Sequence, residues 1–254
     1  MAEKTTADLY DEHAGDWARD QRILLSDFTA RPRVIEELAP AGKRVLDLGC
    51  GEGYVARLAA RAGAFSVFGI DSSVEMIDNA RRSAHAETAC QLTFLARDAT
   101  QLTTTEADAD FDCAMAVFLF NYLTRAEMEH VMRVARVRIV PGGSFVFTVP
   151  HPCFPYMRSP SKPFYFKTEG HDYFAGVDCT YEGQIWRRDG VTVPVRCVHK
   201  TWSDYFEALG RAGFTTIPKV VELHVTDDHV RDDPAFFGPL RGYPLHVLFR
   251  AEVP

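Results

Sequence analysis

Apolar and polar residues along this chain form a repeating series of short strands and longer helices. Apolar residues at helical spacing predict helices over residues 8–39, 54–62, 73–86, 125–140 and 202–212. Short apolar runs predict strands over residues 44–48, 66–70, 91–96, 111–118, 144–149, 215–223 and 245–253. Strands that alternate with helices predict crossover units, and therefore an α/β fold with a doubly wound, mostly parallel sheet. Because the strands are apolar throughout, we expect helices on both faces of the sheet.

The series is interrupted between residues 151 and 200. This segment contains five prolines and nine aromatic residues in fifty, about 18% aromatic against 12% for the whole chain. Disordered linkers are poor in aromatic residues, so we expect a folded insertion or lid within a single domain of residues 1–254. The acidic, proline-containing stretch over residues 226–244 is expected to be a loop.

The turn after the first predicted strand carries the strongest chemical signal. The strand runs into Asp47-Leu48-Gly49-Cys50-Gly51-Glu52-Gly53, and a helix follows. Glycines allow positive φ angles and a close approach of the backbone to a ligand. The N–H groups at the start of the helix can stabilise a carboxylate or a phosphate. The third glycine comes one residue too early for the G-x-G-x-x-G pattern of dinucleotide-binding folds.

Acidic residues end the next two predicted strands. Asp71 can accept hydrogen bonds from both hydroxyls of a ribose, and Asp98, beside the Ala99 N–H, can accept one from an adenine amino group. Each acid has a plainer alternative, as a solvated loop residue or as the N-cap of the next helix. Ligands of such sheets bind at the carboxyl ends of the strands, so the three features together predict a nucleoside site.

The stretch VLDLGCGEG, the two acids and a Pro-Gly-Gly before the fifth strand resemble the class I S-adenosylmethionine-dependent methyltransferases over residues 8–150 and 200–254. The resemblance implies a seven-stranded sheet whose last strand is antiparallel. It implies S-adenosylmethionine as cofactor and S-adenosylhomocysteine as product. Residues of the glycine turn, the strand ends and the leading helix are the implied cofactor contacts: Tyr10, Gly49, Cys50, Gly51, Asp71, Ser72, Met76, Asp98, Ala99 and Val117. Trp17 stands where the family pattern has a second tyrosine, Phe118 is expected beside the methionine part, and Met76 has ordinary helix core as its alternative.

The same resemblance makes residues 151–200 a cap over the acceptor, and their aromatic content suits a planar or apolar small molecule. A hydroxyl acceptor benefits from a base with a pKa near neutral, for which histidine is suited. His151, directly after the fifth strand, is the first candidate, and its alternative is a structural residue of the His-Pro turn. The remaining catalytic candidates are His171, Tyr173 and Asn121, with His199 and His246 ranked lower.

Composition narrows the classes of partner. The formal net charge of −7 disfavours nucleic-acid binding, which depends on Lys and Arg. A polar start and the lack of a long apolar run predict no signal peptide, no membrane span and a cytoplasmic location. The cysteines form no C-x-x-C pair and no carboxylates have magnesium-ligand spacing, so we expect no metal. A monomer or a homodimer is expected.

The sequence therefore predicts methyl transfer to an oxygen or nitrogen atom of a small metabolite, as in enzymes of bacterial secondary metabolism. A protein or nucleic-acid methyltransferase is an alternative, although the Asn/Asp-Pro-Pro-Tyr motif is absent after the fourth strand. A cyclase that retains the cofactor is another alternative, and the sequence does not separate it from a methyltransferase because fold does not fix chemistry. The intact glycine turn and both acids argue against a binding module without catalysis.

Overall fold

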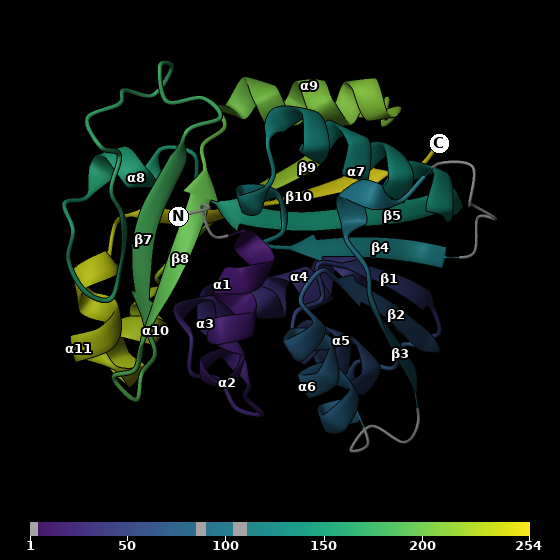
Figure 1. Ribbon diagram of the computed structural model, residues 1–254, viewed down its shortest axis with the longest axis horizontal. Helices are drawn as coiled ribbons and strands as arrows, with labels where there is room; N and C mark the ends of the chain where they lie inside the picture. The colour runs from purple at the N-terminus through teal and green to yellow at the C-terminus, as the bar shows by residue number, and fades with distance from the viewer. Residues whose placement is uncertain (1–4, 85–89, 104–110) are drawn as a thin grey trace.

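A seven-stranded sheet forms the centre of the computed structural model, which describes residues 5–84, 90–103 and 111–254 (Figure 1). Its strands are β1 (Arg44–Leu48), β2 (Ser66–Asp71), β3 (Gln91–Ala96), β4 (Phe111–Val117), β5 (Ile139–Pro150), β9 (Lys219–His224) and β10 (Pro244–Glu252). They lie in the order β3-β2-β1-β4-β5-β10-β9. The pairs from β3 to β5 are parallel, and β10 is antiparallel to both of its neighbours. The predicted doubly wound, mostly parallel sheet with an antiparallel last strand is confirmed.

Helices cover both faces of this sheet (Figure 1). One face is covered by α7 (Arg125–Arg138) and α9 (Trp202–Ala212), and the other by α4 (Arg31–Leu38), α5 (Tyr54–Arg61) and α6 (Val74–Ala84). Along β4, Ala114 and Ala116 pack into the first layer, whereas Cys113 and Met115 pack into the second. Successive side chains of a strand point to opposite faces, which explains why these strands are apolar throughout.

Two predicted boundaries around β5 are wrong. The helix expected over residues 125–140 ends at Arg138, and the strand expected over 144–149 already begins at Ile139. The Pro141-Gly142-Gly143 segment therefore lies inside β5 rather than before it. The pairing with β4 is irregular there, since Phe111 pairs with Ile139 and Cys113 with Ser144. A bulge accommodates residues that sequence pattern alone indicates as a helix stop.

Two other expected segments also differ from the structure. The single helix expected over residues 8–39 is divided into α1 (Thr6–Glu12), α2 (Ala14–Trp17), α3 (Leu25–Thr29) and α4. The loop expected over residues 226–244 contains α10 (Asp227–Asp232) and α11 (Pro234–Phe237). Capping side chains account for both short helices, because Thr226 Oγ1 accepts from His229 N at 3.4 Å and Asp233 Oδ1 accepts from Phe236 N at 3.0 Å.

The insertion between β5 and α9 is folded, as its aromatic content predicts. It contains α8 (Phe154–Met157), β6 (Phe164–Phe166), β7 (Thr180–Trp186) and β8 (Thr192–Val198). The three strands form an antiparallel sheet in the order β6-β7-β8, which we call the cap sheet. Its buried residues share one core with α2, α3 and α11, represented by Phe154, Trp17 and Phe237. Among the described residues, no helix combines the length and the apolar character needed to cross a membrane.

Candidate functional site

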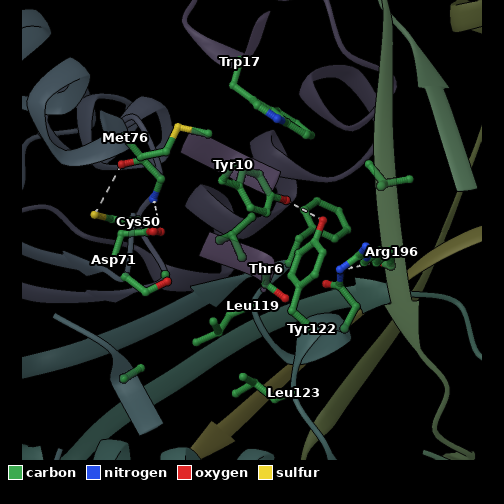
Figure 2. A pocket seen from close by; sticks show the side chains of 18 of the residues that line it. Thr6, Tyr10, Trp17, Cys50, Asp71, Met76, Leu119, Tyr122, Leu123 and Arg196 are labelled. Atoms are coloured by element: carbon green, nitrogen blue, oxygen red, sulfur yellow. Dashed lines mark hydrogen bonds between the residues drawn. The ribbon is translucent and has the colours of Figure 1, made fainter. Parts of the chain in front are cut away.

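A cavity of about 520 Å³ lies at the carboxyl ends of the parallel strands. Residues that follow β1, β2, β3 and β4 form one part of its wall. The leading helices contribute Tyr10 and Trp17, whose side chains are labelled in Figure 2. The cap sheet contributes the remaining part, through Phe164, Phe166, Ile185, Val195 and Arg196. Three segments that are distant in the sequence therefore enclose one space.

The glycine turn, which follows β1, lines this cavity through Gly49 and Gly51. Gly49, Gly51 and Gly53 have φ angles of 71°, 54° and 77°, a region that favours glycine. A Cβ atom on Gly49 would lie 2.9 Å from Leu119 Cδ1, whereas one on Gly51 would meet nothing within 4 Å. The N–H groups of Gly49 and Cys50 both donate to Ile70 O at 2.9 Å. The turn is thus fixed to β2 while Gly51 keeps an open face toward the cavity.

Asp71 ties the glycine turn to the end of β2. Its Oδ2 accepts from Gly51 N at 2.8 Å and its Oδ1 accepts from Ser73 N at 3.0 Å. Burial raises the pKa of Asp71, and these backbone hydrogen bonds oppose that rise. Ser73, not Asp71, caps the helix that follows, since Ser73 Oγ accepts from Met76 N at 3.1 Å. Asp71 therefore lies in the cavity wall with its two oxygens held in place (Figure 2).

Asp98 and Met76 each line the cavity, as expected of a cofactor contact, and each also has the structural role given as its alternative. Asp98 Oδ1 accepts from the N–H and the hydroxyl of Thr100, both at 2.8 Å, and caps the short helix Ala99–Gln101. It also lines the cavity. Met76 is 2% exposed and packs in the core below the leading helices, and it lines the cavity as well. A structural role and a cavity position coexist at both residues.

The structure brings all ten expected cofactor residues to this one cavity, and their binding role stays a prediction. They are Tyr10, Gly49, Cys50, Gly51, Asp71, Ser72, Met76, Asp98, Ala99 and Val117. Trp17 and Phe118 line it too, and the Tyr10 and Trp17 ring centroids are 5.4 Å apart. Phe118 has a φ of 60°, an uncommon value for a residue with a side chain. Backbone strain of this kind concentrates at functional sites.

Asp47 is a buried acid of the cavity wall. Its side chain is 1% exposed, and its Oδ2 has no hydrogen-bond partner among the described residues. Burial raises the pKa of Asp47 to about 8, and the charge of Asp71 adds to this rise. Asp47 therefore carries a proton at neutral pH when no cation lies next to it.

A buried cluster of charges borders the cavity, with Arg19, Arg31 and Glu52 in its lining. Asp27 accepts from Arg19 Nη2 at 2.9 Å and from Arg31 Nη1 at 2.8 Å. Glu52 accepts from Arg19 at 3.0 Å and from Arg57 at 2.9 Å. Arg57 also lies 3.8 Å from the exposed Asp20, so the three guanidinium groups share two buried carboxylates and one exposed carboxylate. The sequence analysis missed this cluster because an isolated arginine in a helix carries no signal of burial.

Arg31 is the member of this cluster that has unused hydrogen-bonding capacity at the cavity wall. Its Nη1 donates to Ser26 Oγ and Asp27 Oδ1, but its buried Nε has no partner within the described part of the chain. Burial and the charge of Arg19 both lower the pKa of Arg31. A guanidinium group remains charged in proteins, so this position favours an anion from outside the chain.

His151, the first expected base, lies outside the cavity lining and forms part of the structure behind it. Its side chain is buried, with Nε2 2.8 Å from Glu222 Oε1. Its Nδ1 accepts from Cys153 N at 3.2 Å, and its ring packs against Trp202. Both ring nitrogens are engaged, so the alternative reading of His151 as a structural residue of the His-Pro turn accounts for its position.

The other catalytic candidates divide between the cavity and the cap interior. Tyr173 accepts from Trp202 N at 3.0 Å through its hydroxyl, and His171 stacks on Tyr181, so both lie away from the cavity lining. A catalytic role at either position stays a prediction. Asn121 does line the cavity, and it is 3% exposed.

His246 lines the cavity although its sequence context ranked it low. Its ring stacks on Phe164 and meets the edge of Phe118 at a centroid distance of 5.0 Å. Burial lowers the pKa of His246 to about 3, and the charges of Arg31 and His151 contribute. The side chain is therefore neutral at physiological pH. Its position inside a strand gave no sign of which face it would occupy.

Two tyrosines join the leading helix to the sheet edge across the cavity. The hydroxyl of Tyr10 on α1 donates to the hydroxyl of Tyr122, which follows β4 (Figure 2). Burial raises the pKa of Tyr122 to about 12. Both phenols are therefore neutral at physiological pH and can both donate and accept hydrogen bonds.

Comparison with known proteins finds similarity to methyltransferases. Residues 45–143 match the model of a methyltransferase domain. Ribosomal protein L11 methyltransferase of Burkholderia cenocepacia is 33% identical over 109 residues, which is 43% of this chain and 32% of that protein. The chain thus covers about a third of the length of these first curated relatives. The 27-O-demethylrifamycin SV methyltransferase of Amycolatopsis mediterranei is 32% identical over 149 residues, with 54% of this chain and 52% of that protein covered.

A solved structure extends the similarity to most of the chain. The S-adenosylmethionine dependent methyltransferase from Mesorhizobium loti superposes with a TM-score of 0.62 at 27% sequence identity, covering 87% of this chain and 95% of that one. Sheet topology, the matching domain model and this structural relative together show that the chain contains a methyltransferase domain of the class I S-adenosylmethionine-dependent type.

Proposed function

We propose that this protein transfers a methyl group to an oxygen or nitrogen atom of a small, mainly apolar molecule. One observation carries the proposal: the cavity joins a nucleoside-type wall to an apolar wall. The first contains the glycine turn, Asp71 and Asp98, and the second is formed by the cap strands. Two ligands of different chemistry can therefore lie in contact inside one enclosure, as group transfer requires.

The residues present fit S-adenosylmethionine, which supplies an activated methyl group on its sulfonium. Asp71 and Asp98 offer carboxylate oxygens for the ribose hydroxyls and the adenine amino group. Gly51 lines the cavity, and a Cβ there would meet no atom within 4 Å, so the turn leaves room for a ligand at this position. The unpaired Nε of Arg31 and the unpaired Oδ2 of Asp47 suit the carboxylate and the amine of an amino-acid group.

The cap wall suits an apolar acceptor. Phe164 and Phe166 are 3% exposed and face the cavity from β6, with Ile185 and Val195 beside them. Such a wall provides contact area but few polar partners, which is typical of a small-molecule site. One relative is named for a small-molecule acceptor, 27-O-demethylrifamycin SV, which supports this class of acceptor here. The acidic net charge of −7 makes a nucleic acid a poor alternative.

Positioning, more than proton transfer, is the contribution that these residues can make. With a pKa of about 3, His246 is a weak base, and with a pKa of about 12, Tyr122 keeps its own proton. Alignment of two bound reactants and exclusion of water accelerate such a displacement without a strong base. We therefore expect acceptors that are already nucleophilic at neutral pH.

Calorimetric titration with S-adenosylmethionine, with NADH as the control, tests the cofactor assignment. We expect binding of the former in the micromolar range and none of the latter. Asp71→Ala should weaken that binding at least several-fold, because hydrogen bonds to a charged group contribute about 1.5–3 kcal/mol each. Asp112→Ala, which removes an acid at the opposite end of β4, is the matched control and should leave affinity unchanged. Tight binding of NADH alone would refute the proposal.

A further inference from the structure

We infer that Asn121 positions the acceptor, and that the acceptor is a mainly apolar molecule whose hydroxyl or amine hydrogen is donated to Asn121 Oδ1. This inference rests on the proposed function and specifies its substrate class. Asn121 follows β4 in the short helix Phe120–Tyr122, where Phe120 is fully buried and anchors the turn. The amide thus has a fixed place at the cavity wall.

The pattern of unpaired polar atoms singles out this amide. Within the described part of the chain, eight buried side-chain nitrogen or oxygen atoms have no hydrogen-bond partner. Three of them belong to residues that line the cavity: Arg31 Nε, Asp47 Oδ2 and Asn121 Oδ1. Buried polar groups in folded proteins are nearly always paired, and an exception calls for an explanation. A partner that arrives with a ligand provides one.

Two of the three atoms are accounted for by one ligand. Arg31 and Asp47 suit the carboxylate and the amine of the proposed cofactor, as a donor and an acid respectively. Asn121 Oδ1 has neither of these charges to pair with and can only accept a hydrogen bond. It is therefore available to the second ligand, which must bring a donor.

The orientation of the amide is set by the cap. Asn121 Nδ2 donates to the backbone oxygen of Arg196 on β8 at 3.4 Å. The opposite amide orientation would place Oδ1 against that carbonyl oxygen, so two acceptors would face each other. The oxygen is consequently the end that lacks a partner. A side-chain hydrogen bond from Asn121 also opposes the rise that burial causes in the pKa of Tyr122, so the donor end of the amide is engaged within the protein.

Two flat probes that differ in a single hydroxyl test this inference: 2-naphthol and naphthalene. Their affinities are measured by ligand-observed NMR on the full chain saturated with S-adenosylhomocysteine. The wild type should bind 2-naphthol roughly two- to tenfold more tightly than naphthalene, the net contribution of one hydrogen bond. Asn121→Leu should abolish that ratio, keep its affinity for S-adenosylhomocysteine and unfold at no lower temperature, because it removes an unpaired buried polar group.

Three comparisons make the outcome decisive. Asn121→Asp retains an acceptor oxygen and should retain the preference, and Asn121→Ala replaces the leucine variant if that variant does not fold. Gln184→Leu is the matched control, since this amide accepts from Tyr165 within the cap sheet and lies outside the cavity lining. A ratio that survives in Asn121→Leu, or a wild type without any preference for 2-naphthol, would overturn the inference alone. Failure of the wild type to bind S-adenosylhomocysteine would overturn the proposed function and this inference with it.

Discussion

Asp47 shows how a single buried side chain links the site to pH. Its pKa of about 8 in the folded protein exceeds the value of about 3.9 expected in an unfolded chain. Between these values the folded state binds a proton that the unfolded state has released. The resulting stabilisation is fully present below about pH 4 and is lost as the pH rises through about 8.

Asp47→Asn should therefore change how stability depends on pH. Asparagine cannot ionise, so the unfolding temperature of the variant should rise relative to wild type between pH 5 and pH 8. With these pKa values the wild type loses about 1.4 kcal/mol per pH unit over most of this range. Each kcal/mol corresponds to roughly 2–4 °C for a chain of this size. Thermal unfolding without ligand across that range measures it. Parallel curves for the two proteins would mean that Asp47 is ionised in the folded chain throughout.

Asp112→Asn provides the contrasting control. The side-chain hydrogen bond from Arg44 lowers the pKa of Asp112, so its charge stabilises the folded state at neutral pH. Removal of this charge should lower the unfolding temperature slightly. The variant should not show the gain in unfolding temperature toward pH 8 that we expect for Asp47→Asn. The two variants thus separate the loss of a paired surface charge from the loss of a buried, unpaired one.

Arg31 should determine affinity for a carboxylate. We expect Arg31→Met to weaken binding of S-adenosylhomocysteine by about tenfold or more, as for a charge-assisted hydrogen bond of 1.5–3 kcal/mol. Binding of 5′-methylthioadenosine, which has the nucleoside but no amino-acid carboxylate, should stay within about twofold of wild type. Calorimetry with both ligands gives the comparison.

Arg33→Met on the same helix is the control for Arg31→Met. Arg33 pairs with Glu36 and Glu37 outside the cavity lining, so neither ligand should lose affinity. An Arg31→Met variant that binds S-adenosylhomocysteine normally would reassign the unpaired Nε to an anionic group of the acceptor. An equal loss for both ligands would indicate a general disturbance of the fold.

Sequence reasoning located the residues of the wall that contains the glycine turn better than those of the rest of the cavity, for a physical reason. Gly51, Asp71 and Asp98 stand at strand ends, and the ends of parallel strands converge on one edge of a sheet. Arg31 and His246 lie inside a helix and a strand, so their direction depends on packing against other elements. His151 also stands at a strand end, but its ring turns toward Glu222 and away from the cavity lining.

At the scale of elements, side-chain hydrogen bonds hold α1 to the sheet edge. The Tyr10–Tyr122 hydroxyl pair is one, and the hydrogen bond from Ser73 Oγ to Asp11 is another. Tyr122→Phe should release the first while it preserves the ring. We expect backbone amides of residues 6–12 to exchange several-fold faster, because local opening depends on the few interactions that hold a segment. Dissociation of S-adenosylhomocysteine, followed by stopped flow, should become faster to a similar degree.

Tyr165→Phe is the control for this release. The Tyr165 hydroxyl donates to Gln184 Oε1 at 3.0 Å within the cap sheet, so the change removes a comparable hydrogen bond elsewhere. Exchange in residues 6–12 and dissociation of the ligand should match wild type. If Tyr122→Phe behaves in the same way, the tyrosine pair does not hold α1 over the cavity.

The segment around residue 230 contains helix-start residues, although its acidic, proline-containing sequence predicted a loop. Thr226 is followed by two acidic residues, and Pro234 occupies the first turn of α11. Both are helix-start features, yet each helix is too short to show an apolar period. By contrast, α7 and α9 were predicted because eleven or more residues display that period. Element length thus decided which helices could be recognised.

At the scale of the whole molecule, His246 stands where the main sheet meets the cap and the leading helices. It belongs to β10, stacks on Phe164 of β6 and approaches Thr29 of α3 at 3.5 Å. Its pKa of about 3 in the folded state is below the value of about 6.5 of an unfolded chain. The neutral ring therefore contributes stability that is present above pH 6.5 and is lost as the pH falls toward 3.

We expect His246→Phe, which keeps a ring but cannot titrate, to resist acid better than wild type. Relative to their difference at pH 7.5, the variant should gain about 1–3 kcal/mol at pH 4.5, which is roughly 2–10 °C in unfolding temperature. Comparison of the two pH values cancels any constant cost of the larger ring. His171→Phe changes an exposed histidine of the cap and is the matched control. A gain in that control alone, or in neither variant, would show that protonation of His246 does not destabilise the folded protein in acid.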